Sequence, residues 1–123
     1  MTGSMSSGFL TTHVLDTARG VPAAGLNISL FVSGEDGYKL LATATTNADG
    51  RTDSPILPAA EFRAGRYRLV FHAGAYLDKH FDDLPEPKFL SDIPIDFAMA
   101  DAASHYHVPL LLSPFGYSTY RGS

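Results

Sequence analysis

The sequence has no cysteine among its 123 residues, which excludes disulfide bonds, thiolate nucleophiles and metal sites built on cysteine. Charge is also sparse, because charged residues make up 18% of the chain and the formal net charge is only −4. The chain lacks the basic stripe that phosphate contacts require, so nucleic acid is not expected as a partner. No stretch approaches the ~20 apolar residues of a membrane helix, and we expect a cytoplasmic protein with no membrane partner.

The length is that of one compact domain. The first eight residues are small and polar, and they predict a disordered leader over residues 1–8, followed by a domain over residues 9–123. The 8 prolines and 11 glycines are spread along the chain and separate short apolar segments. This distribution is typical of an all-β protein.

Alternation of apolar and polar residues with period two is the dominant pattern, and it places one set of side chains in the core. Between Leu26 and Ser33 the even positions are apolar, and Tyr67, Leu69 and Phe71 repeat the pattern. Turn signals at residues 19–22, 34–37, 47–50 and 113–114 separate such segments. The predicted strands are residues 9–16, 26–33, 39–46, 51–55, 65–73, 90–98, 106–112 and 115–121. Eight short strands at this spacing predict a β-sandwich of two sheets.

One short helix is predicted over residues 75–84. Tyr76, His80, Phe81 and Leu84 fall near a common face of this segment, and Pro85 ends it.

Three histidines are candidates for chemistry. His13 lies on the odd-numbered face of the first strand with Thr11, while the even positions would take the core face. His105 and His107 share one face of a later strand, which is also the spacing of a possible metal pair with His13 as third ligand. Residue types alone leave a zinc site and a metal-free site both open.

Arg51 follows the turn pair Asp49-Gly50, where an exposed arginine contributes little to stability. In a site, its guanidinium would donate paired hydrogen bonds to a carbonyl-rich ring and would disfavour protonation of a nearby imidazole.

Ser118 lacks a nucleophile elbow, so a covalent serine mechanism is not expected. Ser118 and Tyr120 alternate along the last strand, and their hydroxyls would share one face.

Three segments together carry a family resemblance: Leu10-Thr11-Thr12-His13-Val14-Leu15-Asp16, Thr46-Asn47-Ala48-Asp49-Gly50-Arg51-Thr52, and His105 to Ser123 with its ending Tyr120-Arg121-Gly122-Ser123. In this order they resemble the 5-hydroxyisourate hydrolases, the enzymatic branch of the transthyretin family. The resemblance covers nearly the whole chain from about Phe9 onward.

The resemblance implies an all-β fold, the transthyretin-like (prealbumin-like) β-sandwich of two four-stranded sheets, with one short helix after the fifth strand. It implies a homotetramer, a dimer of dimers, with sites in a central channel, and metal-independent chemistry without a cofactor. The catalytic set would be His13, Arg51 and His107, with His105 outside the group of residues that contact the substrate. The substrate-binding set would be Ser118, Tyr120, Arg121, Gly122 and Ser123.

The activity that the resemblance implies is hydrolysis of 5-hydroxyisourate to 2-oxo-4-hydroxy-4-carboxy-5-ureidoimidazoline in urate catabolism. One histidine, with Arg51 nearby, would activate water, and His13 is favoured as that base. The alternative is a non-catalytic carrier of small molecules on the same scaffold, as in transthyretin. A carrier would need an apolar channel, whereas His13, Arg51 and His107 would make this one polar.

Overall fold

The computed structural model describes residues 7–123 as a β-sandwich with one α-helix. Residues 1–6, most of the predicted leader, lie outside the described residues. The strands are β1 (Phe9–Asp16), β2 (Val21–Pro22), β3 (Asn27–Gly34), β4 (Gly37–Thr45), β5 (Gly65–His72), β6 (Asp92–Met99), β7 (His105–Ser113) and β8 (Gly116–Thr119). The helices are α1 (Ala73–His80) and the one-turn 3-10 helix η2 (Ala59–Glu61).

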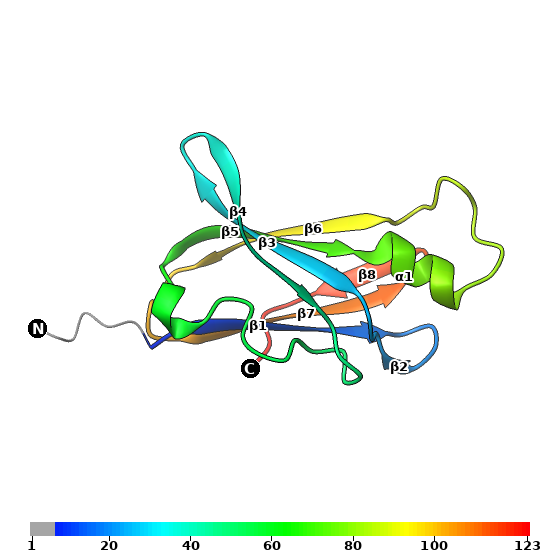
Figure 1. The fold of residues 1–123 in the computed structure, drawn as a ribbon, viewed down its shortest axis with the longest axis horizontal. Coiled ribbons are helices and arrows are strands. Elements are labelled where there is room, and N and C mark those ends of the chain that lie inside the picture. Colours follow the sequence, from blue (N-terminus) through cyan, green and yellow to red (C-terminus); the bar gives the residue numbers. More distant parts are fainter. Residues whose placement is uncertain (1–6) are drawn as a thin grey trace, which may run out of the picture.

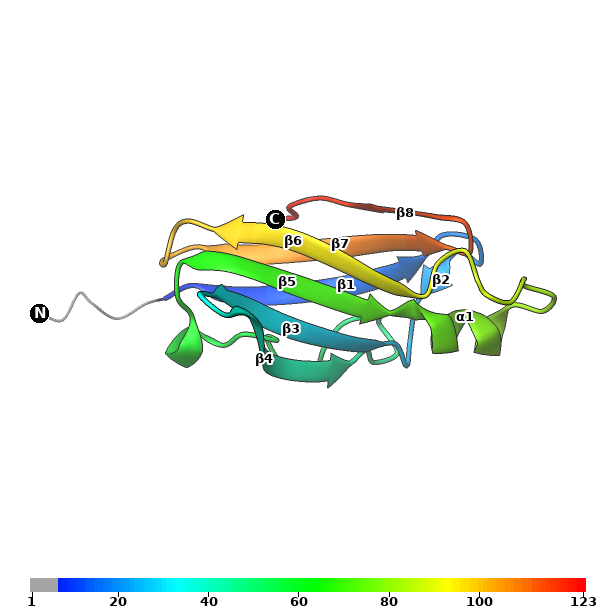
Figure 2. The ribbon, with the colours of Figure 1, turned by 90° about the horizontal axis from the view of Figure 1, so that it is seen from above.

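The strands form two four-stranded sheets, one in the order β2-β1-β7-β8 and one in the order β4-β3-β5-β6. The sheets are the two layers seen in Figure 1, and α1 follows β5 at one end of the sandwich (Figure 2). β1 and β7 run parallel, and the other strand pairs are antiparallel. This arrangement confirms the predicted sandwich of two four-stranded sheets with one short α-helix.

The core lies between the sheets and follows the predicted alternation. Leu10 and Val14 are fully buried, while His13 on the opposite face of β1 is half-buried. On β5, Tyr67, Leu69 and Phe71 are all buried, as predicted. Burial of such large apolar side chains from both sheets is the main stabilising contribution to the fold.

The prediction of a strand at residues 51–55 is wrong. The structure still has eight strands among the described residues, because β2 forms where no strand was predicted. Beyond a single bridge between Arg51 and His13, this segment is irregular and bends at residues 53–54. The reason is the loop before it: the Asn47 side-chain carbonyl accepts hydrogen bonds from the backbone N–H groups of Asp49 and Arg51, at 2.9 and 3.2 Å. The segment therefore meets β1 at the Arg51 bridge, leaves it, and meets it again at Leu57, which bridges to Leu10.

The helix begins and ends earlier than predicted. Its start packs closely, since a Cβ at Gly74 would come within 2.6 Å of Ser91 Oγ. Phe81 is already extended and only caps the last turn with its N–H to the Leu77 carbonyl. Phe81 and Leu84 therefore pack against the core from the chain beyond the helix. Among the described residues, no helix is long and apolar enough to cross a membrane.

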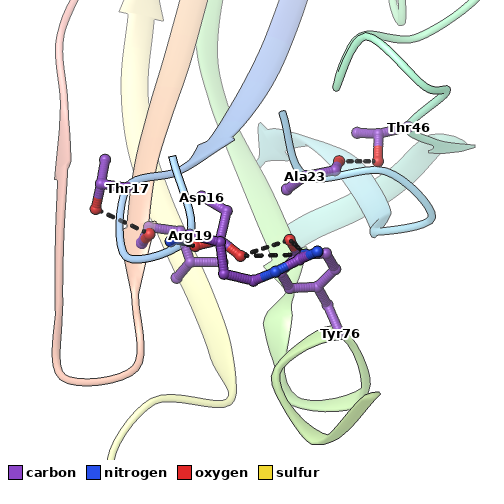
Figure 3. Close-up of polar contacts among 7 residues, drawn as sticks. Asp16, Thr17, Arg19, Ala23, Thr46 and Tyr76 are labelled. Atoms are coloured by element: carbon purple, nitrogen blue, oxygen red, sulfur yellow. Dashed lines mark hydrogen bonds and ion pairs between the residues drawn. The ribbon is translucent and has the colours of Figure 1, made fainter. Parts of the chain in front are cut away.

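A buried polar cluster ties the end of β1 to α1 (Figure 3). The Asp16 carboxylate is 1% exposed and accepts hydrogen bonds from the Tyr76 hydroxyl at 2.6 Å and the Arg19 backbone N–H at 2.9 Å. Burial, and then the bond to Asp16, raise the pKa of Tyr76 to about 12. A carboxylate with several donors is satisfied in the core, so this cluster holds β1 in a defined position.

Candidate functional site

A polar cavity of about 610 Å³ opens on the outer face of the β2-β1-β7-β8 sheet. Three segments far apart in the sequence line it: β1 with β7, the loop after Gly50, and the C-terminal residues. The lining residues are Thr11, Thr12, His13, Arg51, Thr52, Asp53, Ser54, Pro55, His105, His107, Tyr120, Arg121, Gly122 and Ser123. The predicted catalytic residues and most of the predicted substrate-binding residues thus meet at one cavity.

His13 and His107 form a direct pair in this cavity. The parallel pairing of β1 and β7 sets Thr11 opposite His107, which leaves His13 one step further along the same face. His13 Nδ1 and His107 Nε2 lie 2.6 Å apart, a hydrogen-bond distance, and the ring centroids are 4.7 Å apart. Each imidazole therefore fixes the tautomer of the other.

Backbone pairing between β1 and the loop at Gly50 brings Arg51 beside His13. The Gly50 carbonyl, at a residue with a φ of 73°, accepts a hydrogen bond from the Val14 N–H at 2.8 Å, and the backbone of Arg51 forms a single β-bridge with His13. A Cβ at Gly50 would lie 2.4 Å from the Val14 carbonyl, so only glycine fits here. The tight turn places the arginine charge beside the imidazole pair.

The site keeps both histidines neutral near pH 7. Burial, and after it the charge of Arg51, lower the pKa of His13. Burial lowers the pKa of His107 to about 4, with further contributions from the charges of His13, Arg51 and His105. A neutral imidazole can accept a proton, which is the state that a general base needs.

The C-terminal segment runs back beside β7 (Figure 2), and its Gly122 forms a bridge with His107. The Gly122 N–H donates to the His107 carbonyl at 2.7 Å, and His107 is only 6% exposed. The guanidinium of Arg121 lies over the Tyr106 ring, 4.1 Å from its centroid, a cation–π geometry. Contacts of Gly122 and Arg121 therefore hold the C-terminal segment against β7.

The predicted substrate-binding residues divide into two groups. Tyr120, Arg121, Gly122 and Ser123 line the cavity. Ser118 does not, because it lies in β8 opposite Leu111, outside the cavity of this single chain.

Thr11 was missed in the sequence and His105 was placed outside the catalytic set, yet the structure connects both to the pair. Thr11 Oγ1 lies 2.6 Å from His105 Nε2 and 2.7 Å from His107 Nδ1. His105 lines the cavity but bonds Thr11 rather than His13. The sequence did contain a signal for Thr11, because the alternation places it on the same face of the first strand as His13.

The geometry of the histidine pair favours a hydrogen bond over a shared metal ion. Two nitrogens that each lie ~2.0–2.1 Å from a tetrahedral zinc are separated by about 3.3 Å. The observed separation of 2.6 Å is shorter. Within residues 7–123, no three His, Cys, Asp or Glu side chains are grouped so that they could hold a metal.

Two further histidines lie away from the cavity. His72 bonds Ser29 at 2.9 Å and Asp92 at 3.0 Å, in the order of a catalytic triad. However, Ser29 lies in β3, whose two edges are both paired, so the adjacent backbone N–H groups serve the sheet rather than an oxyanion. His80 packs on the Tyr76 ring.

The fold and the cavity together define a transthyretin-like β-sandwich that carries a polar histidine and arginine site. The chain belongs to the HIUase/Transthyretin family, whose profile matches residues 10–122. This confirms the resemblance seen in the sequence motifs.

Individual relatives include two that are named as enzymes and one that was solved with a bound small molecule. A 5-hydroxyisourate hydrolase of Mesorhizobium japonicum is 59% identical over 99% of this chain and 98% of its own. The crystal structure of (S)-allantoin synthase superposes with a TM-score of 0.88 at 41% identity over 97% of this chain, which spans about half of that longer protein (46%). Sea bream transthyretin in complex with thyroxine superposes with a TM-score of 0.82 at 30% identity, covering 92% of this chain and 93% of its own.

Proposed function

We propose that this protein hydrolyses 5-hydroxyisourate to 2-oxo-4-hydroxy-4-carboxy-5-ureidoimidazoline. The full-length relative named as a 5-hydroxyisourate hydrolase supports the substrate. The observation that carries the chemistry is the neutral His13–His107 pair beside Arg51 in a polar cavity. Such a set suits the activation of water for attack on a ring carbonyl.

His13 is the base in this proposal. His107 has both ring nitrogens engaged, Nδ1 with Thr11 and Nε2 with His13. His13 uses Nδ1 for the pair, which leaves Nε2 to meet a water molecule in the cavity. His107 therefore acts through His13, by orienting it and sharing its proton, as the third member of a triad orients its base.

Each hydrolysis consumes one water molecule and opens the ring. Water adds its oxygen to the ring carbonyl carbon and gives one proton to His13 Nε2. The ring C–N bond then breaks, and the leaving nitrogen takes a proton back from the histidine. The second proton of the water leaves with the new carboxyl group, which ionises at neutral pH.

Arg51 has two tasks in this scheme. Its charge adds to burial in keeping the imidazoles neutral before the reaction, and the two together lower the pKa of His13. Its guanidinium also stabilises negative charge that develops on the carbonyl oxygen. Tyr120, Arg121, Gly122 and Ser123 form the wall that positions the planar ring.

A homotetramer, a dimer of dimers, would complete the site. β6 and β8 each end a sheet, so both present an unpaired edge. Phe115, Tyr117 and Tyr120 are 60%, 46% and 55% exposed, an unusual group of aromatic side chains to leave in water. Burial of this surface between copies would also bring Ser118 to a shared channel. We propose a cytoplasmic location for this assembly.

The competing function is that of a carrier, as the thyroxine complex of the sea bream relative illustrates. The decisive experiment generates 5-hydroxyisourate freshly and follows its absorbance with and without the protein. A hydrolase accelerates the loss of the substrate over many turnovers. A carrier would bind at most one equivalent per site and leave the rate unchanged.

A further inference from the structure

Four side chains that line the cavity form one continuous hydrogen-bonded line, which ends at the exposed His105. His13 Nδ1 lies 2.6 Å from His107 Nε2, His107 Nδ1 lies 2.7 Å from Thr11 Oγ1, and Thr11 Oγ1 lies 2.6 Å from His105 Nε2. His105, at the far end, is exposed, whereas His107 in the middle is buried. All three distances are within hydrogen-bonding reach.

Because of the Thr11 hydroxyl, all the hydrogen bonds in this line must point the same way from donor to acceptor. A hydroxyl carries a single hydrogen, so Thr11 can donate to His107 or to His105 but not to both. Each neutral imidazole likewise has one N–H and one acceptor nitrogen. If Thr11 donates to His105, then His107 donates to Thr11 and His13 donates to His107, which leaves His13 Nε2 as a free acceptor. The opposite direction places a proton on His13 Nε2.

We propose that Thr11 and His105 form a proton relay with His107 and His13, in which His105 stores the proton between the two halves of the hydrolysis; this rests on the proposed function. When His13 Nε2 takes a proton from water, its Nδ1 proton passes to His107 Nε2. The Nδ1 proton of His107 passes to Thr11, and the hydroxyl proton of Thr11 passes to His105 Nε2. One proton enters the line, and one positive charge appears on His105.

Electrostatics favours this transfer. A charge on His13 or His107 is opposed by burial and by Arg51, which lower the pKa of both groups. His105 is exposed, and the Phe9 ring stacks on it with the ring centroids 4.1 Å apart and the planes at 11°. A cation over an aromatic face is stabilised. The charged side chains that line the same cavity are Arg51, Asp53 and Arg121.

The relay also explains how one base can serve as the acid. After the shift, His13 Nε2 carries a proton that it can give to the leaving ring nitrogen. The line then shifts back, His105 loses its second proton to Thr11, and the starting state is restored. Thr11 and His105 act through His13 and His107 and need not touch the substrate.

Two variants separate a relay from a structural role. Thr11→Val keeps the β-branched shape that suits β1 but removes the hydroxyl. His105→Gln keeps a side-chain hydrogen-bond donor and acceptor but cannot hold a second proton. Thr11→Ser is the matched control because it retains the hydroxyl.

The experiment measures 5-hydroxyisourate turnover in mixtures of H₂O and D₂O. We expect kcat to fall about tenfold in Thr11→Val and His105→Gln with KM little changed, and Thr11→Ser to stay within about threefold of wild type. The dependence of the rate on deuterium fraction should be curved in wild type and Thr11→Ser, where several protons move, and linear in the other two. Wild-type kcat and a curved dependence in Thr11→Val or in His105→Gln would overturn the relay, although the hydrolase function would stand.

A second readout does not depend on activity. The ¹⁵N shifts of the His107 ring in the free protein should change in Thr11→Val, which loses the partner of Nδ1, and should stay close to wild type in Thr11→Ser. Unchanged His107 ring shifts in Thr11→Val would overturn the hydrogen-bonded line, whether or not the protein consumes 5-hydroxyisourate. Failure of the wild-type protein to consume 5-hydroxyisourate would by itself reject only the proposed function.

Discussion

Gly122 lies directly against the imidazole of His107. Its N–H donates to the His107 carbonyl at 2.7 Å, and a Cβ built on Gly122 would come within 2.8 Å of His107 Cδ2 and 3.3 Å of Pro109 Cγ. The contact joins the C-terminal segment to the paired histidines.

Gly122→Ala should impair catalysis more than folding. The added methyl group would push the His107 ring from its bond with His13, and a small misplacement of a catalytic group costs about tenfold or more in rate. We expect kcat/KM on 5-hydroxyisourate to fall by that amount. The matched control is Gly34→Ala, where the new Cβ would make an ordinary contact of 3.6 Å with the Gly37 carbonyl, far from the site. Equal activity in the two variants would show that the tail does not position His107.

Arg51→Gln should move the acid limb of the kcat/KM profile to higher pH. Arg51 lowers the pKa of His13 and His107, so its removal raises the pH below which the base is protonated. The residual activity of this variant is measured from pH 4.5 to 8 at raised enzyme concentration. Arg66→Gln, on the exposed surface of β5, is the control and should retain the wild-type limb. An unmoved limb in Arg51→Gln would mean that another group sets the pH dependence.

Stability should fall as the medium becomes acidic. The pKa of His107 is lowered to about 4 in the folded protein, below that of an unfolded histidine at ~6.5, so the unfolded chain binds more protons between these values. The contribution is fully present above pH 6.5 and is lost as the pH falls towards 4. Urea unfolding at pH 7.5, 5.5 and 4.5 measures it, and His107→Gln should show a shallower dependence. Identical slopes for both proteins would contradict the shifted pKa.

Residues appended after Ser123 should harm activity, whereas residues added before Met1 should not. Ser123 lines the cavity and Gly122 is fastened to β7, so an extension would place bulk in a confined site. The same peptide tag is joined to either end, and turnover and oligomeric size are compared. Equal activity would show that the tail can leave the cavity without cost.

Much of this fold is visible in the sequence because its strands alternate strictly. Leu10, Val14 and Tyr67 each lie on the face that the alternation predicts, as does His13 on the opposite one. The strand predicted at residues 51–55 does not form, because hydrogen bonds to the Asn47 side chain turn the loop, and alternation of residue types does not reveal such bonds. The predicted bounds of α1 were wrong for a related reason, since the close packing of Gly74 on Ser91 is a tertiary contact.

The site was predicted as a set of residues but not as a geometry. The motifs placed His13, Arg51 and His107 together only through a family resemblance. The direct bond between His13 and His107 depends on the parallel register of β1 and β7, which are separated by most of the chain. The role of Thr11 follows from that same register, and the exclusion of Ser118 follows from the pairing of β8 with β7. Neither register can be derived from local patterns.

The most direct test of the account is kcat/KM on freshly generated 5-hydroxyisourate for wild type, His13→Ala, Arg51→Ala and His107→Ala, each checked for folding by circular dichroism. We expect rapid turnover by the wild-type protein and a loss of about 10²-fold or more in each variant, the scale of positioned acid–base groups. His105→Ala should lose much less. Near-wild-type turnover by folded His13→Ala would contradict the assignment of the base, and a wild-type protein that leaves the substrate untouched would contradict the proposed function altogether.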